Sequence, residues 1–181
     1  MADVKQTIQD FYTQAQARDF ARNNLFRVLN IDFGSGSSIS INEEDLVYAT
    51  TATLPGKTIQ DVVVPYMGLD FHVPGTVKYN NSAGYSLTFR ADESYRLYEK
   101  FQQVINDTFD DSTSTGNYFT PKADSVIDLV QLDKELNKLS QYQLVGASIR
   151  SVGDLSYDVT ASGDVQTFTV TVAYQFYRKT S

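Results

Sequence analysis

The feature that most constrains the fold is an alternating stretch near the C-terminus, VQTFTVTVAYQFYRK, residues 165–179. Every second position is apolar: Phe168, Val170, Val172, Tyr174 and Phe176. The positions between them are mostly polar: Thr167, Thr169, Thr171, Ala173 and Gln175. Successive side chains of a strand point to opposite faces, so this period of two predicts a β-strand with one core face and one polar face.

Similar patterns predict further strands at 25–33, 46–54 and 84–90. Residues 57–81 predict two or three short strands, broken at Pro65, Gly68 and Pro74-Gly75, because proline and glycine interrupt strands. Residues 125–150 predict a hairpin that turns near Lys134–Lys138. The chain is therefore expected to be mainly β, of the α+β class.

Two segments predict helices instead. Residues 92–106 place Leu97, Phe101 and Val104 on one face, with Asp92 as the N-cap, and predict a flanking helix. Residues 4–17 predict a short N-terminal helix with a thin apolar stripe, within an arm of about residues 3–18. We expect this helix to be ordered only against another surface, such as a neighbouring subunit. Residues 34–45 and 107–122 have the composition of surface loops.

Length and composition favour one folded unit over residues 1–181. Hydrophobic residues make up 41% of the chain and charged residues 20%, which is typical of globular domains and not of disorder. The N-terminus lacks the pattern of a secretion signal, and no stretch approaches the roughly 18 apolar residues of a membrane span. A net charge of −7 is opposite to that of proteins that bind nucleic acids tightly.

The residue types that usually perform catalysis or bind cofactors do not form a recognisable pattern. The single histidine, His72, has no cysteine or second histidine to complete a metal or nucleophile site. Gly34-Ser35-Gly36 lacks the remainder of a nucleotide-binding motif, and Asp107, Asp110 and Asp111 lack the spacing of a calcium loop. We therefore expect no catalytic residue, no cofactor and no metal, and a protein that is not an enzyme.

Four segments, in this order, resemble the tail tube protein of T4-type contractile-tailed bacteriophages. They are DFARNNLFRV (19–28), ATTATLPGKTIQDVVVPYMGLDFHVPG (49–75), SLTFRADESYRLYEKFQQ (86–103) and SVGDLSYDVTASGDVQTFTVTVAYQFY (151–177). Together they cover well over half of the chain. The resemblance implies the tail-tube fold, an antiparallel β-sandwich or orthogonal barrel with one flanking helix.

The resemblance also implies a function and a set of partners. The subunit would form hexameric rings that stack into a tube inside the contractile sheath and would provide the channel for genome delivery into the host. Its partners would be copies of itself, the tail sheath protein, the baseplate and tail terminator proteins, a tape-measure protein in the lumen, and DNA in transit without tight binding. No membrane contact is implied. The protein would belong to the tail of the virion and would be assembled in the host cytoplasm.

Six residues are candidates for roles in such a tube. Leu54, Pro55, Met67 and Gly68 are candidate subunit contacts, because exposed apolar and Pro/Gly steps at strand breaks often lie at interfaces; they fit core and turn positions equally well. Asp61 and Asp70 are candidate lumen charges. DNA carries about one charge per 1.7 Å, so an acidic wall would let it slide without binding.

Two kinds of alternative remain open from the sequence. A baseplate tube initiator, a tail terminator and an injection-system tube protein would share the fold. A monomeric β-sandwich binding module, for carbohydrate or for a capsid surface, would suit the aromatic content, although tryptophan, the preferred sugar platform, is absent. Sedimentation separates the two kinds, because a binding module stays monomeric at high concentration.

Overall fold

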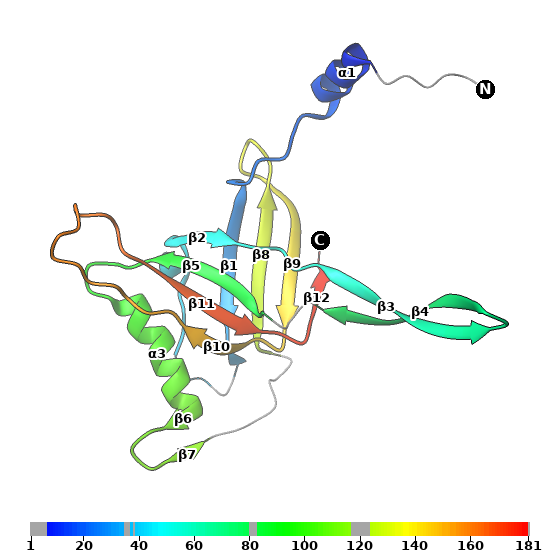
Figure 1. Ribbon diagram of the computed structural model, residues 1–181. Helices are drawn as coiled ribbons and strands as arrows, with labels where there is room; N and C mark the ends of the chain where they lie inside the picture. The colour runs from blue at the N-terminus through cyan, green and yellow to red at the C-terminus, as the bar shows by residue number, and fades with distance from the viewer. Residues whose placement is uncertain (1–6, 35–36, 38, 80–82, 117–123, 181) are drawn as a thin grey trace.

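The computed structural model describes residues 7–34, 37, 39–79, 83–116 and 124–180. Two four-stranded antiparallel sheets form the body of the protein (Figure 1). The first sheet has the order β1-β8-β9-β12 and consists of β1 (Phe26–Asp32), β8 (Val126–Leu132), β9 (Lys138–Val145) and β12 (Phe176–Lys179). The predicted strand at 25–33 and the predicted hairpin at 125–150 are both confirmed, with the turn at Asp133–Asn137.

The second sheet has the order β10-β11-β5-β2 and consists of β10 (Ser148–Val152), β11 (Thr167–Ala173), β5 (Tyr85–Arg90) and β2 (Ala49–Ala52). Its strands cross those of the first sheet at a steep angle in Figure 1, as the strands of an orthogonal sandwich do. The two sheets and one flanking helix match the fold class that the sequence predicts.

The core lies between the sheets and against the flanking helix, α3 (Arg96–Thr108). Phe89 of β5 stacks on Phe168 of β11 with 5.8 Å between ring centroids, and Phe101 of α3 lies 5.3 Å from Phe89. Leu97 and Val104 of the helix are buried in the same cluster. The helical periodicity of α3 thus places its apolar face against the buried side of the second sheet.

The flanking helix begins four residues later than predicted. Asp92 was expected to be its N-cap, but Tyr95 holds that position, and its N–H donates to the Asp92 carbonyl (3.0 Å) in a turn. The Asp92 side chain still accepts a hydrogen bond from the Leu97 N–H (3.4 Å) in the first turn of the helix. Tyr95 has φ 53°, which is left-handed and cannot continue a helix, so regular structure starts at Arg96.

The long C-terminal strand predicted at 165–179 is divided between the two sheets. β11 ends at Ala173, and β12 starts at Phe176 in the other sheet. Tyr174 is fully buried at the crossing, and the Gln175 N–H donates to the Val145 carbonyl (2.9 Å). Phe168, Val170 and Val172 point into the core as expected, but Phe176 is 41% exposed, because the alternation does not survive the change of sheet.

Two other sequence predictions are partly wrong. The strand predicted at 46–54 begins only at Ala49, since Leu46 ends a one-turn helix, α2 (Glu43–Leu46), in which Asp45 pairs with Lys100 of α3. The loop predicted at 107–122 contains a small hairpin, β6 (Phe109–Asp110) with β7 (Thr115–Gly116). Of Gly34-Ser35-Gly36, only Gly34 lies within the described residues.

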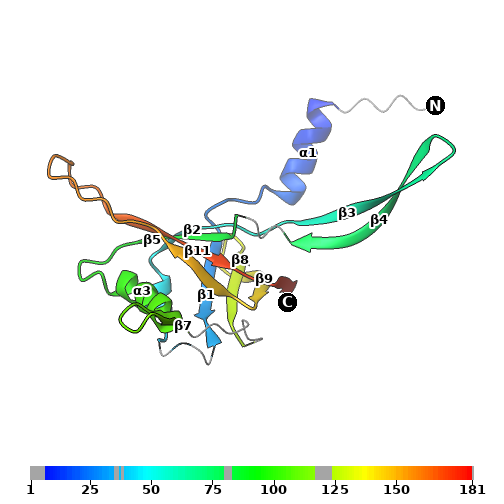
Figure 2. The same ribbon diagram turned by 60° about the horizontal axis from the view of Figure 1, so that its bottom comes forward.

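The N-terminal helix, α1 (Ile8–Arg18), stands away from the sandwich and buries none of its side chains (Figure 2). It begins with a reciprocal cap, in which the Asp10 N–H donates to Thr7 Oγ1 (3.1 Å) and the Thr7 N–H donates to Asp10 Oδ2 (3.0 Å). The Thr7 N–H and, after it, the Thr7 hydroxyl donate to Asp10 Oδ2, and these two hydrogen bonds lower the pKa of Asp10. None of the described helices is long and apolar enough to span a membrane.

Candidate functional site

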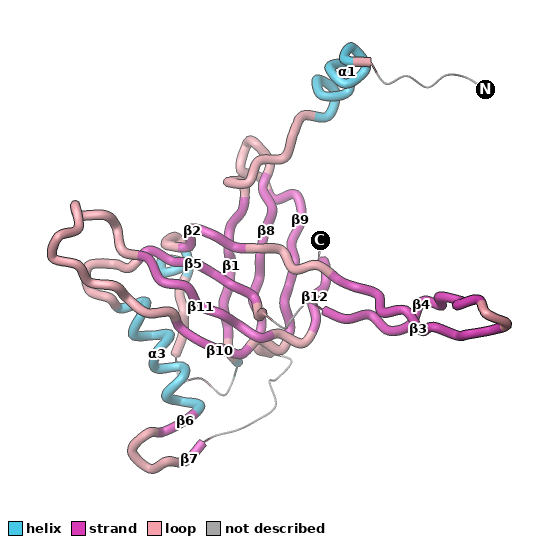
Figure 3. The backbone as a smooth tube through the Cα atoms, viewed as in Figure 1, coloured by secondary structure: helices cyan, strands magenta, loops and turns pink. Residues whose placement is uncertain are grey.

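The most prominent functional feature is a two-stranded ribbon that extends from the body, here called the arm (Figure 3). It consists of β3 (Lys57–Tyr66) paired with β4 (Leu69–Tyr79). The breaks predicted at Pro65 and Pro74-Gly75 are wrong, because both prolines lie inside the strands. Each strand of a two-stranded ribbon has one free edge, where proline's missing N–H removes no hydrogen bond.

The pairing register gives the arm two different faces. Val62 pairs with Val73, Val64 with Phe71, and Tyr66 with Leu69. Because alternate residues share a face, these form one continuous apolar surface, the apolar arm face: Val62, Val64, Tyr66, Leu69, Phe71 and Val73. Each of the six is between 47% and 65% exposed, and no other described part of the chain covers them. Such a contiguous exposed surface usually marks an interface.

The opposite side, the acidic arm face, carries Asp61, Val63, Pro65, Asp70, His72 and Pro74. Both candidate lumen charges therefore lie on the same face of the arm. His72 Nδ1 lies 3.7 Å from Asp61 Oδ2, and both side chains are more than half exposed. The single histidine thus occupies a strand position, as the sequence predicts, and has one carboxylate beside it.

The tip of the arm is a two-residue turn made by two of the candidate interface residues. Met67 has φ 48° and Gly68 has φ 79°, and positive φ at both positions is the type I′ geometry that suits a twisted hairpin. Met67 is 87% exposed. The break predicted at Gly68 is therefore confirmed as a turn, and these two residues are presented at the point furthest along the ribbon (Figure 1).

The root of the arm is fixed to the body by aromatic rings. Lys57 Nζ lies 4.6 Å from the ring centroid of Tyr177 and 5.3 Å from that of Tyr79, which is its cross-strand partner. The Tyr79 and Tyr177 rings pack edge to face at 5.6 Å. The other two candidate contacts, Leu54 and Pro55, lie in the segment that leads into this root, and Leu54 is 39% exposed.

A second functional surface lies on the outer side of the second sheet. β5 and β11 are neighbours, with Thr88 opposite Thr169 and Ser86 opposite Thr171. Their outward side chains form the hydroxyl face: Ser86, Thr88, Thr167, Thr169 and Thr171. The hydroxyls of Thr88 and Thr169 lie 3.2 Å apart. The structure thus joins the polar sides of two separately predicted strands into one hydroxyl-rich, hydrogen-bonding surface, with Arg90 at its edge opposite Thr167.

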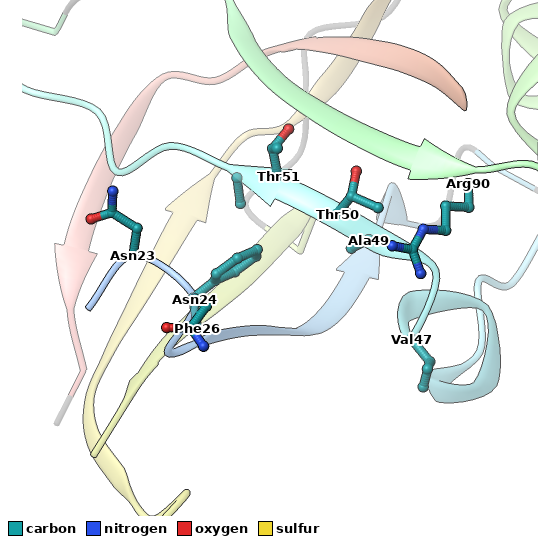
Figure 4. A pocket seen from close by; sticks show the side chains of 9 residues that line it. Asn23, Asn24, Phe26, Val47, Ala49, Thr50, Thr51 and Arg90 are labelled. Carbon is teal, nitrogen blue, oxygen red and sulfur yellow. The ribbon is translucent and has the colours of Figure 1, made fainter. Parts of the chain in front are cut away.

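A third surface is a cleft of about 670 Å³ beside β2, called the β2 cleft (Figure 4). The described residues that line it are Asn23, Asn24, Phe26, Val47, Ala49, Thr50, Thr51, Ala52 and Arg90. Figure 4 shows Arg90 and Val47 at one end of β2, and Asn23, Asn24 and Phe26 toward the other end. Its lining is apolar or uncharged apart from Arg90.

No metal-binding group of three or more acidic, histidine or cysteine residues occurs among the described positions. The acidic residues of the 107–122 segment act locally, since Asp110 Oδ1 accepts hydrogen bonds from the backbone and hydroxyl of Ser112. Those bonds, the hydroxyl first, lower the pKa of Asp110. The apolar arm face and the β2 cleft are suited to packing against protein.

The family model described as "Phage tail tube protein" matches residues 19–180. The chain belongs to the phage tail tube protein family. No curated protein matches it. Its role is therefore that of a structural tail tube component, and it belongs to a phage-type tail.

Solved structures of contractile injection systems share the fold of this tail tube protein. One is a chain of the six-fold symmetrised baseplate of the anti-feeding prophage, with TM-score 0.62, 14% identity and coverage of 88% of this chain and 95% of that one. Another is a chain of the sheath-tube complex of the PVC extracellular contractile injection system, with TM-score 0.58, 14% identity and coverage of 98% and 99%. A third is from the cap that terminates the anti-feeding prophage tube, with TM-score 0.63, 12% identity and coverage of 100% and 99%.

The apolar arm face is the functional surface that reasoning from the sequence missed. Its signal is present, because Val62, Val64 and Tyr66 alternate before the turn, and Leu69, Phe71 and Val73 alternate after it. The prolines led to the prediction of short broken strands, which hid the alternation. Two alternating runs separated by exactly two residues, the second of them Gly68, are the sequence signal of a long hairpin.

Proposed function

We propose that this protein is the self-assembling subunit of a contractile tail tube, forming hexameric rings that stack into a channel for genome delivery. The observation that carries the proposal is the apolar arm face, which extends beyond the body and stays about half exposed or more in the isolated chain. A monomeric protein rarely exposes such a surface, whereas an arm that docks on a second copy buries it. The six-fold symmetry of the similar baseplate structure supports the hexamer.

The hydroxyl face is suited to the wall of the channel. Its hydroxyl groups hydrate well and carry no charge, Arg90 lies at its edge opposite Thr167, and the chain as a whole carries a net charge of −7. DNA would pass such a wall in transit without tight binding. The assignment of Asp61 and Asp70 as lumen charges stays a prediction, and so do the subunit contacts of Leu54, Pro55, Met67 and Gly68.

The proposed partners follow from the same role. They are the tail sheath protein outside the tube, the baseplate and tail terminator proteins at its ends, and a tape-measure protein in its lumen. The likeness to chains from a sheath-tube complex and from a sheath/tube terminator supports the first two. Residues 1–181 would act as one unit, with a helical N-terminal extension of about residues 3–18 that is distinct from the β3–β4 arm. The protein would have no enzymatic activity and would assemble in the host cytoplasm.

Negative-stain electron microscopy and sedimentation of the purified protein, across a concentration series, test the proposal. We expect stacked rings or open tubes. Val64→Asp combined with Phe71→Asp should leave the protein folded but monomeric, because it places charge on the apolar arm face. Val159→Asp is the matched control, since Val159 is fully exposed on the body. Wild-type protein that stays monomeric at all concentrations contradicts the proposal and favours the binding module.

A second candidate function is that of an end component, a tube initiator or terminator. The likeness to a cap chain and to a baseplate chain favours it, because those proteins lie at tube ends. The same micrographs distinguish the two roles. Tubes of unlimited length support the tube subunit, and discrete single rings support an end component.

A further inference from the structure

We propose that the arm of one copy docks along strand β2 of a second copy, so that its apolar face fills the β2 cleft and its acidic face meets Arg90. This inference rests on the proposed function, because it presupposes self-assembly. It goes further by assigning the surface on which the arm docks, the face that the arm turns inward, and the opposite charges that meet in that orientation.

Strand β2 offers a free edge that can accept another strand. Among the described residues β2 pairs with β5 alone, and it is the last strand of its sheet. The two strands of the arm likewise pair only with each other. Free strand edges in solution are either protected or used for pairing. The arm extends away from the body in both views, so it does not fold back onto its own cleft (Figures 1 and 2).

The hydrophobic pattern selects which way an added strand must face. Ala49 and Ala52 lie opposite the buried residues Phe89 and Leu87, so their side chains point toward the core, while Thr51 lies opposite Thr88 and points outward. The inner side of β2 is therefore lined by small side chains. A shift of one residue turns a strand over, so only one set of registers places the apolar arm face inward.

The same registers bring opposite charges together. Arg90 alternates with Phe89 on β5, which places it on the outer side of the sheet with Thr88. With the apolar arm face inward, the acidic arm face lies on this outer side as well. Asp61 and Asp70 are the two acidic residues of segment 58–77, which contains no lysine or arginine. Arg90 is the single charged side chain among the described residues that line the cleft.

The two surfaces lie at different places on the molecule. Each copy can therefore dock its arm on one neighbour while its β2 cleft binds the arm of another. Such a contact is head to tail, and its repetition either closes a ring or continues without limit. The contact also removes the apolar arm face from water in the complete assembly. On the outer side of the sheet, the acidic arm face of one copy would lie beside the hydroxyl face of the next.

A charge reversal tests the inference. Arg90→Glu, or Asp61→Lys with Asp70→Lys, should each raise the concentration needed for assembly by about tenfold, because each places like charges together. Arg90→Glu combined with both lysine substitutions should restore assembly to within about twofold of wild type, as a direct pairwise interaction requires. Lys138→Glu, an exposed reversal on β9, is the control and should have little effect.

Disulfide trapping locates the contact independently of charge. The chain has no cysteine, so introduced pairs are the only thiols. Protein with Thr51→Cys would be mixed with protein carrying one cysteine in place of Val63, Pro65 or His72, which would lie on the same outer side as Thr51, and a disulfide between the two species should form in the assembly. Leu139→Cys, exposed on the other sheet, should give none.

The outcomes separate this inference from the proposed function. Tubes that form normally with Arg90→Glu and give no disulfide at Thr51 overturn the β2 cleft as the receptor, while the tube function stands. If Val64→Asp with Phe71→Asp abolishes assembly in the same series, the arm still acts, but on another surface. A wild-type protein that never assembles overturns the function and the inference together.

Discussion

Tyr85 is the residue that best shows how the body is linked to the arm. Its ring is buried and packs edge to face with Tyr174 at 6.5 Å, and Tyr174 packs in the same way with Tyr79 at the arm root, again at 6.5 Å. Its hydroxyl group has no hydrogen-bond partner among the described residues. Burial without a partner costs free energy that the aromatic packing must offset.

Replacing Tyr85 with phenylalanine should stabilise the fold. The substitution keeps the ring and removes the buried hydroxyl group, so we expect the free energy of unfolding to rise by about 1 kcal/mol. Chemical denaturation followed by fluorescence or circular dichroism measures it. Tyr157→Phe is the control, since Tyr157 is largely exposed. A clear loss of stability would mean that the hydroxyl group has a partner in the folded protein.

The same residue predicts a dependence of stability on alkaline pH. Burial, and secondarily Tyr174, raises the pKa of Tyr85 well above its usual value of about 10. The unfolded chain loses this proton above pH ~10 while the folded chain keeps it, so stability is unchanged below that pH and falls above it. Denaturation midpoints at pH 8–11.5 should show this fall. Tyr85→Phe should make it less steep, and an equal slope in both proteins would contradict the assignment.

At the scale of elements, the arm is a ribbon that cannot be stable by itself. An isolated two-stranded hairpin is marginal in water, and all of the arm's residues up to Lys78 are exposed. Its position therefore depends on its root, where Lys57 lies over two tyrosine rings, and on its internal register. Both can be changed without touching the core.

Lys57→Met should loosen the arm at its root. The change keeps most of the aliphatic side chain and removes the charge over the rings of Tyr79 and Tyr177, which contributes about 0.5–1 kcal/mol. We expect faster hydrogen exchange in the arm and a two- to fivefold higher assembly concentration. Lys78→Met, on the same ribbon, is the control. If the two variants behave alike, the rings do not hold Lys57 in place.

Gly75→Ala should disturb the register of the arm. A Cβ atom at position 75 would lie 2.6 Å from the Gln60 carbonyl oxygen and 2.9 Å from Val62, at the point where the pairing shifts by one residue. Assembly should weaken, while the thermal unfolding of the sandwich stays within about 1 °C of wild type, because the arm lies outside the core. Gly56→Ala meets no atom within 4 Å and is the control. Normal assembly of Gly75→Ala would show that the register is not required.

At the scale of the whole molecule, the chain places two apolar elements outside its sandwich. One is the arm, and the other is α1, where Ile8 is 90% exposed and Phe11 is 56% exposed. Among the described aromatic rings, Phe11 packs only against Phe20, at 6.0 Å between centroids. Both elements thus expose apolar side chains that an assembly of several subunits could bury.

Helix α1 should become ordered on assembly. Isolated helices of 11 residues are marginal in water, and α1 buries no side chain to offset the loss of chain entropy. Hydrogen exchange should be fast at residues 8–18 in the monomer and slow in tubes. Residues 126–132 of β8 serve as the reference, since they should be protected in both. Protection of α1 in the monomer would contradict the prediction.

The sequence was sufficient to predict what depends on local pattern. Alternation at 84–90 and at 167–173, and helical spacing at Leu97, Phe101 and Val104, led to the correct element types and to the core face of each. These predictions succeeded because a strand or helix in contact with a core must repeat its apolar positions with its own period. The family resemblance rested on the order of such segments along the chain.

The tertiary structure decided what depends on which strand pairs with which. It divided the C-terminal run at Tyr174 between two sheets, and it joined residues 57–79 into one arm despite Pro65 and Pro74. It also placed Arg90 at the end of a cleft beside a free strand edge. A period of two states only that a strand has two faces. The strand's neighbours, set by long-range packing, determine whether those faces meet the core, the solvent or a second copy of the chain.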